Sequence, residues 1–161
     1  MVKVVGIDPG LAGTGIGVIE GTRRQITGYA FGSIETPASE SICSRLNTIY
    51  SKILDFLRLQ QPDRVVIEDI YSLEKYPGSG ILLGKVSGVL LLAACQSGLD
   101  VEEIPVREAK KIVSGNGGAD KYQMERAVRN LINHDGEIRP FHASDALGLA
   151  LAGYFRLQRT L

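Results

Sequence analysis

Two carboxylates in this sequence stand at the ends of apolar runs, Asp8 after residues 2–7 and Glu68 after residues 64–67. Pro9 and Gly10 follow Asp8 and mark a turn, so the run before it is typical of a strand that ends on an acid. An isolated aspartate at such a turn often accepts backbone hydrogen bonds only. Two carboxylates at one place would repel each other unless a cation lay between them, and the chemistry they suggest is divalent-metal binding.

A third carboxylate lies near the start of the last amphipathic segment. If a helix begins near Pro140, His142 and Asp145 are three residues apart and share one face. Asp145 alone could simply favour the positive end of that helix. Beside Asp8 and Glu68, it would complete an acidic metal site.

Composition favours one soluble domain that spans residues 1–161, since 44% of the residues are hydrophobic and 22% are charged. The net charge of zero excludes a strongly basic nucleic-acid binder. The charge is unevenly placed, however: residues 1–104 hold nine Lys and Arg against twelve Asp and Glu, and residues 105–161 hold nine against six. An acidic site beside a basic surface suits a polyanionic substrate.

The sequence predicts a cytoplasmic protein without membrane contact. It shows no charged and then apolar leader, and the apolar stretch Val86 to Cys95 is shorter than the roughly 20 residues of a membrane span. Cys43 and Cys95 lie in apolar helical patterns without metal-ligand spacing, which predicts buried, reduced thiols.

The periodicity of apolar residues predicts an α/β fold. We expect helices over 39–61, 82–98, 107–114, 121–133 and 143–158, strands over 2–7, 14–20, 26–34, 64–69 and 101–106, and loops over 72–80 and 114–120. Short connections make the first three strands antiparallel, and helical crossovers make the last two parallel. The result is a five-stranded mixed sheet with helices on both faces. Asp8 and Glu68 would meet at its carboxyl edge, where such sheets bind ligands.

Five motifs in this order resemble the RuvC-type Holliday junction resolvases: GIDPG at 6–10, the strand at 14–19, IEDIY at 67–71, the segment 110–121, and HASDALGLALA at 142–152. The resemblance covers nearly the whole chain and implies an RNase H-like fold. It also implies a homodimer that resolves four-way DNA junctions by two symmetric metal-dependent nicks, in recombination and repair, with a branch-migration helicase complex as partner. The catalytic and metal-binding cluster maps onto Asp8, Glu68, His142 and Asp145.

The resemblance implies two magnesium ions per active site, for which manganese can substitute. Many members carry Asp where this chain has His142. Imidazole suits manganese better than magnesium, so His142 could ligate an ion or act as a base on the attacking water. A purely structural histidine is the third alternative, and all three stay open at the level of the sequence.

Contacts with DNA are expected from Arg107, Lys110 and Lys121 on the backbone and from Tyr71 on unpaired bases, by their match to family positions. The helix from Leu82 to Gly98 is apolar on several faces and is expected to form the homodimer interface. Two other functions are kept open: a YqgF-type nuclease that acts on structured RNA, and a junction-binding module without catalysis.

Overall fold

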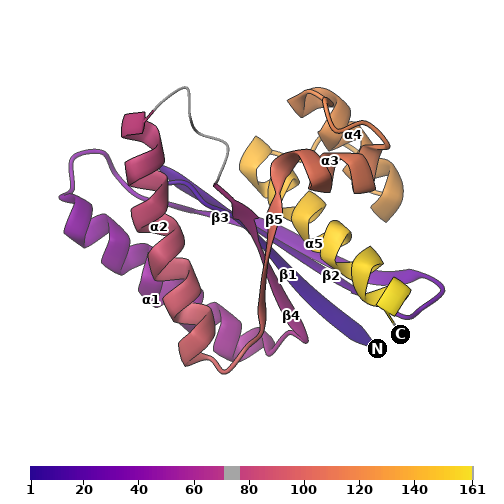
Figure 1. The fold of residues 1–161 in the computed structure, drawn as a ribbon, viewed down its shortest axis with the longest axis horizontal. Coiled ribbons are helices and arrows are strands. Elements are labelled where there is room, and N and C mark those ends of the chain that lie inside the picture. The colour runs from indigo at the N-terminus through magenta and orange to yellow at the C-terminus, as the bar shows by residue number, and fades with distance from the viewer. Residues whose placement is uncertain (71–76, 161) are drawn as a thin grey trace.

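A computed structural model describes the backbone of residues 1–70 and 77–160 as one five-stranded sheet with helices on both sides (Figure 1). The sheet order is β3-β2-β1-β4-β5, with β1, β2 and β3 antiparallel and β1, β4 and β5 parallel. The predicted mixed sheet is confirmed. The elements are β1 (Val2–Asp8), β2 (Gly13–Gly21), β3 (Ile26–Glu35), α1 (Ile42–Gln60), β4 (Arg64–Asp69), α2 (Pro77–Gln96), β5 (Val101–Pro105), α3 (Val106–Ser114), α4 (Lys121–Ile132) and α5 (Phe141–Thr160).

The helices divide between the two faces of the sheet (Figure 1). Strand side chains alternate between faces, so Val5 and Ile7 of β1 pack in one apolar cluster with α1 and α2, while Val4 packs in a second cluster with α3, α4 and α5. By the same alternation, Gly6 and Asp8 belong to the face that α5 covers. The alternation of side chains along β1 therefore places Asp8 on the same face of the sheet as α5.

Glycines in β1 and β2 let α5 lie directly on the sheet. Gly6 and Gly17 are partners across the two strands, and a Cβ atom at Gly17 would lie 2.4 Å from the backbone nitrogen of Leu147. A Cβ at Gly6 would lie 2.1 Å from the carbonyl oxygen of Ala146. Because backbone atoms cannot give way at such distances, only glycine permits this approach.

Ion pairs on Arg156 tie the second half of α5 to its neighbours. The guanidinium of Arg156 bonds the carboxylates of Glu102 on β5 and Glu108 on α3. Glu102 also accepts a hydrogen bond from Arg64 on β4 at 2.9 Å. These ion pairs fix the orientation of α5 at a point on the helix that is far from His142 and Asp145.

Several sequence expectations are corrected. The helix α2 begins at Pro77, so residues 77–80 are helical where a loop was predicted; Pro is favoured at the first helical position, and two glycines obscured the pattern. The helix α1 begins at Ile42 because Ser41 caps it, accepting a hydrogen bond from the backbone N–H of Ser44. Cys43 and Cys95 are exposed, not buried, because both lie on the outer sides of their helices.

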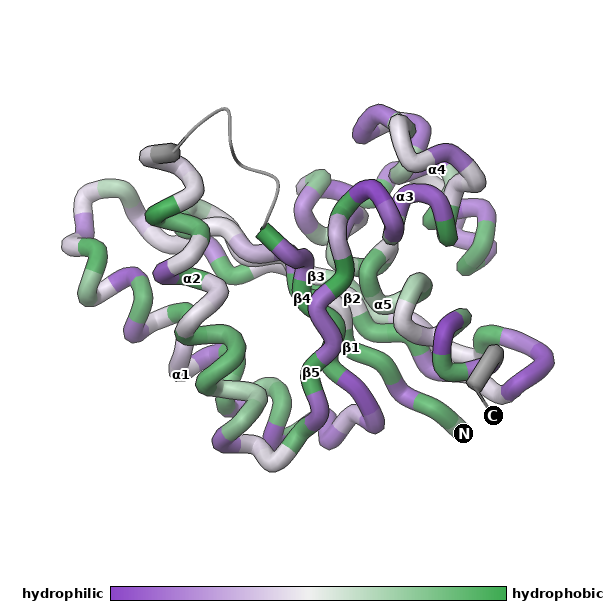
Figure 2. The backbone as a smooth tube through the Cα atoms, in the orientation of Figure 1, coloured by the Kyte–Doolittle hydropathy of each residue, from purple (hydrophilic) through white to green (hydrophobic). Residues whose placement is uncertain are grey.

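The helix α2 is also longer and more apolar than the stretch Val86 to Cys95 suggested. Gly78–Gln96 is long and apolar enough to cross a membrane by length and composition alone, and 28% of it is buried. Figure 2 shows apolar residues along this helix, on the side of the sheet away from α5. The prediction that this apolar stretch is too short to span a membrane is therefore wrong. The apolar side chains that α2 leaves exposed need another explanation.

We expect Gly17→Ala to lower the free energy of unfolding by about 1–3 kcal/mol or more, since its methyl group would push α5 off the sheet. Gly32→Ala in β3 is the matched control, because a Cβ there would meet nothing within 4 Å. Urea unfolding of both variants measures the difference. Equal stability of the two would contradict the close approach of α5.

Candidate active site

Asp8 and Glu68 lie side by side at the carboxyl edge of the sheet, as predicted. The parallel strands β1 and β4 pair Ile7 with Ile67, so the residue that follows each is an acid on the face of α5. The two carboxyl groups are close enough for the charge of Glu68 to raise the pKa of Asp8.

The start of α5 brings the other two predicted residues to the same edge. Asp8 pairs with Gly15 on β2, and a Cβ at Gly15 would lie 1.9 Å from the carbonyl oxygen of His142. The backbone of His142 therefore lies over the strand beside Asp8. One turn along the helix, Asp145 is close enough to repel the charges of both Asp8 and Glu68.

The loop that follows Asp8 is held by two hydroxyl groups. Thr14 donates to the carbonyl oxygen of Gly10 at 2.8 Å, and Thr36 donates to the carbonyl oxygen of Leu11. The backbone N–H of Thr36 also donates to Ala12 at 3.1 Å. These bonds connect the β1–β2 turn to the end of β3 and fix the backbone from which the Asp8 side chain extends.

All three carboxyl groups hold their protons more tightly than usual. Burial raises the pKa of Asp8 well above its ordinary value, and repulsion from Glu68 and Asp145 raises it further. Burial and repulsion from Asp145 raise the pKa of Glu68 from 4.5 to about 6, although Asp8 and Lys110 oppose the shift. Burial also raises the pKa of Asp145, against the attraction of Lys110 and His142. The site has more negative charge than it can balance alone.

This donor set fits a divalent cation. Carboxylate oxygens are the preferred ligands of magnesium and manganese, and a cation would offset the burial of three charged groups and the repulsion that Asp8 and Glu68 experience. In the part of the chain that the structure describes, no three Asp, Glu, His or Cys side chains are arranged to hold one ion as they stand. Binding therefore requires side chains to turn toward the ion and protonated carboxyl groups to lose their protons.

Lys110 reaches the acidic cluster from α3. Its charge lowers the pKa of both Glu68 and Asp145, and the three residues line one small cleft with Val106, Ala109, Met124 and Leu149. The sequence predicted Lys110 as a contact to DNA. The structure places Lys110 next to the carboxylates, where its ammonium group balances part of their negative charge.

The other predicted DNA contacts lie around this cleft or outside the described residues. Arg107 is exposed at the start of α3, and its aliphatic chain packs against the turn at Gly117. Lys121 is exposed at the start of α4, with its ammonium 4.9 Å from the centre of the Phe141 ring. Tyr71 is not among the residues that the structure describes.

Glu35 is a residue of this region that sequence reasoning missed. Its carboxylate lies 3.5 Å from Nε2 of His142, across the end of β2. A lone Glu at the end of the third strand gave no motif that could have selected it.

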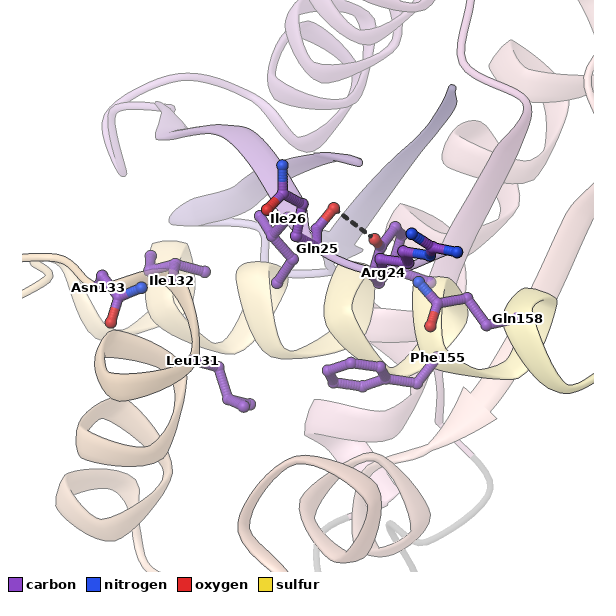
Figure 3. A pocket seen from close by; sticks show the side chains of 9 residues that line it. Arg24, Gln25, Ile26, Leu131, Ile132, Asn133, Phe155 and Gln158 are labelled. Carbon is purple, nitrogen blue, oxygen red and sulfur yellow. Dashed lines mark hydrogen bonds between the residues drawn. The ribbon is translucent and has the colours of Figure 1, made fainter. Parts of the chain in front are cut away.

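A separate pocket of about 380 Å³ lies at the other end of α5 (Figure 3). Tyr154 forms part of its wall and donates a hydrogen bond to the carbonyl oxygen of Gln25 at 3.1 Å. Nine residues of helix separate Tyr154 from Asp145, or roughly 14 Å along the axis. The pocket therefore has no part in chemistry at the carboxylates. It is lined by Arg24, Gln25, Ile26, Leu131, Ile132, Asn133, Tyr154, Phe155 and Gln158.

Comparisons with known proteins agree on one family. The family model described as crossover junction endodeoxyribonuclease RuvC matches residues 4–153. The protein of that name from Moorella thermoacetica is 36% identical over 148 residues, which cover 92% of this chain and 88% of that protein. The one from Dehalococcoides mccartyi is 38% identical over 149 residues, which cover 92% and 90%.

Solved structures confirm the RNase H-like fold expected from the sequence. The structure of Thermus thermophilus RuvC in complex with Holliday junction substrate aligns with a TM-score of 0.88 and 26% identity, over 99% of this chain and 97% of that one. The yeast mitochondrial Holliday junction resolvase Ydc2 aligns with a TM-score of 0.66 and 13% identity, over 98% and 79%, and shows a shared fold alone.

The raised pKa values predict how stability depends on pH without metal. Below about pH 4.5, Glu68 is protonated in both the folded and the unfolded chain; between 4.5 and about 6 the unfolded chain loses this proton first. The free energy of unfolding should therefore fall as the pH rises, by roughly 2 kcal/mol for Glu68.

Denaturant unfolding in EDTA at pH 4.5 and pH 7 measures this fall. Glu68→Gln should reduce the fall by about its own share, while Asp8 and Asp145, whose pKa values are also raised, keep the remainder. Magnesium should stabilise the wild-type protein more at pH 7 than at pH 4.5. A fall of the same size in Glu68→Gln would show that other groups cause it.

Proposed function

The chain belongs to the RuvC family of crossover junction endodeoxyribonucleases, and on this premise we propose that it resolves four-way DNA junctions in recombination and repair. It hydrolyses one phosphodiester bond in each of two opposing strands. The observation that carries the proposal is the convergence of Asp8, Glu68 and Asp145 at one edge of the sheet, where burial raises the pKa of each and repulsion raises those of Asp8 and Glu68 further. The similarity to a RuvC structure that contains Holliday junction substrate supports the choice of DNA.

Divalent-metal dependence follows from the family, and the oxygen donors and excess negative charge of the site fit such an ion. We propose two magnesium ions, replaceable by manganese, which Asp8, Glu68, His142 and Asp145 would hold. When bound, such ions activate a water molecule and stabilise the leaving 3′ oxygen, so the products are a 5′-phosphate and a 3′-hydroxyl.

Lys110 helps an anionic substrate approach the carboxylates. A phosphate brought next to three acids meets strong repulsion, and the ammonium of Lys110 is the cation that acts on both Glu68 and Asp145. We infer that Lys110 contacts the phosphate to be cut or its neighbour. Its role is to bind and orient that phosphate.

Exposed cations next to the cleft extend this surface along the DNA backbone. Arg107 and Lys121 lie at the starts of α3 and α4, on the side of the sheet that carries Asp145. Contacts of this kind position DNA without reading its sequence. Tyr71 is assigned to unpaired bases at the crossover from the family resemblance alone.

The helix α2 is proposed as the homodimer interface. Leu82 is 36% exposed, Ile81 64% and Leu92 49%, which leaves apolar side chains uncovered along one helix. A second copy of the same helix would cover them, and a twofold dimer would offer two equivalent active sites to the two equivalent strands of a junction. From the family resemblance we also propose that a branch-migration helicase complex is a partner. We propose the cytoplasm as the location of the protein.

Asp8→Asn should abolish nicking of a synthetic four-way DNA junction in magnesium while leaving the affinity for the junction within about threefold of wild type. The substitution removes a charge needed for metal binding and no contact to phosphate. Gel assays of cutting, and binding assays in calcium, measure the two effects. Faster cutting of structured RNA than of the junction by the wild-type protein would favour the RNA nuclease instead, and binding without any cutting would favour a junction-binding module.

Leu92→Glu should shift the protein from dimer to monomer, because it places a charge in the proposed apolar interface. Leu59→Glu on α1 is the control, since Leu59 is 79% exposed on a different helix. Sedimentation equilibrium measures the oligomeric state. A dimer equally stable in both variants would rule out α2 as the interface.

A further inference from the structure

Glu35 lies beside His142 at the edge of the sheet that carries the active site. It is the last residue of β3 and pairs with Gly13 of β2, which places it on the face that α5 covers. Nε2 of His142 lies 3.5 Å from Oε1 of Glu35. Residues from three different elements therefore meet at this point.

The carboxylate of Glu35 is held in place from its own strand. Ser33 lies two residues earlier on the same face of β3, and its hydroxyl donates a hydrogen bond to Oε1 of Glu35 at 2.8 Å. That oxygen is the one nearest the imidazole. The contact between the acid and the histidine is therefore directed by a third side chain.

The glycine between the two side chains makes their approach possible. A Cβ at Gly13 would lie 2.6 Å from Nε2 of His142 and 2.8 Å from Oε2 of Glu35. A Cβ at Gly15 on the same strand would lie still closer, 1.9 Å from the carbonyl oxygen of His142, so the histidine backbone is held against the strand. The position of the imidazole is thus limited by the backbone beneath it and by the carboxylate beside it.

This arrangement favours one position for the hydrogen on the imidazole. A carboxylate only accepts hydrogen bonds, so a hydrogen bond from His142 to Glu35 requires the Nε2–H form. In neutral histidine, Nδ1 then keeps a lone pair that can bind a metal or take a proton. The distance exceeds the roughly 2.7–3.2 Å of a hydrogen bond. The Glu35 side chain is 62% exposed and has room to close the gap when the site binds its ligands.

We propose that Glu35 is a positioning residue for junction cutting: it holds His142 as the Nε2–H tautomer, so that Nδ1 serves the metal site. The inference rests on the proposed function, because it takes His142 to act in metal-dependent cutting. Metal-binding histidines commonly donate their second N–H to a carboxylate or carbonyl, which orients the ring. An exposed pair of this kind adds little to folding stability, so removing Glu35 should affect His142 and leave the fold intact.

A double-mutant cycle tests the proposal with wild type, Glu35→Ala, His142→Ala and the double variant. Two quantities are measured: the affinity for manganese without DNA, by calorimetry, and the rate of junction cutting in manganese. Glu35→Ala should lower at least one of them by about tenfold, at the low end of the effect known for such partners. The double variant should be no worse than His142→Ala, because Glu35 acts only through the imidazole.

Two further variants separate the hydrogen bond from charge and from stability. Glu35→Gln keeps an oxygen that can accept from Nε2–H, and it should retain the quantity that Glu35→Ala loses to within about threefold. Glu20→Ala removes the same charge from β2, where Glu20 pairs with Lys3 at 2.8 Å, and should match wild type in both measurements. All variants should unfold at the same denaturant concentration to within the error for a surface substitution.

Additive effects of Glu35→Ala and His142→Ala would overturn the proposal, since Glu35 would then act independently of the histidine. Wild-type values for Glu35→Ala in both measurements would overturn it as well. Coupling in the cutting rate alone would support positioning of His142 as a base. If wild-type protein failed to cut junctions, the proposed function would fall, and the manganese affinities would still decide the role of Glu35.

Discussion

The close approach of α5 to the β1–β2 ladder is the constraint on which the active site depends. Asp8 and Glu68 are placed by the sheet alone, but His142 and Asp145 reach them only because Gly6, Gly15 and Gly17 present no side chains to the helix backbone. A single methyl group there would meet carbonyl or amide atoms that cannot move independently of the helix. Glycine weakens a strand by removing packing and adding freedom to the unfolded chain. In this chain, the destabilising glycines stand at the positions where α5 contacts the sheet.

The acidic site works against the stability of the fold that builds it. Three carboxyl groups are buried near one another, and this burial raises the pKa of each. Lys110 and His142 offset only part of the negative charge. The rest of the structure must therefore hold these groups together, through the buried core on either side of the sheet and the ion pairs of Arg156. Metal binding and folding stability are linked for this physical reason.

The two faces of the sheet carry different tasks. The helices α3, α4 and α5 bring the cations and the second half of the acidic cluster to one face, while α1 and α2 cover the other (Figure 1). Because α2 leaves Ile81 and Leu92 exposed, the face without acids has the apolar surface that a second copy could cover. Glu35 shows that β3, at the outer edge of the sheet, can still act on the site through a side chain of α5.

The strands, the mixed sheet and the meeting of Asp8 and Glu68 could be predicted from the sequence, because side chains alternate along a strand and an acid that ends an apolar run is a local signal. The sequence also placed His142 and Asp145 on one helical face, since residues three apart in a helix are neighbours. The start of α2 at Pro77 could not be predicted, because the glycines that follow it obscure the helical pattern. The exposure of Cys43 and Cys95 could not be predicted either, because it depends on how their helices pack. The pairing of Glu35 with His142 also belongs to the tertiary structure. The two residues lie on elements far apart in the chain, and their contact depends on strand register and on the empty space above Gly13, neither of which leaves a pattern in the neighbouring sequence.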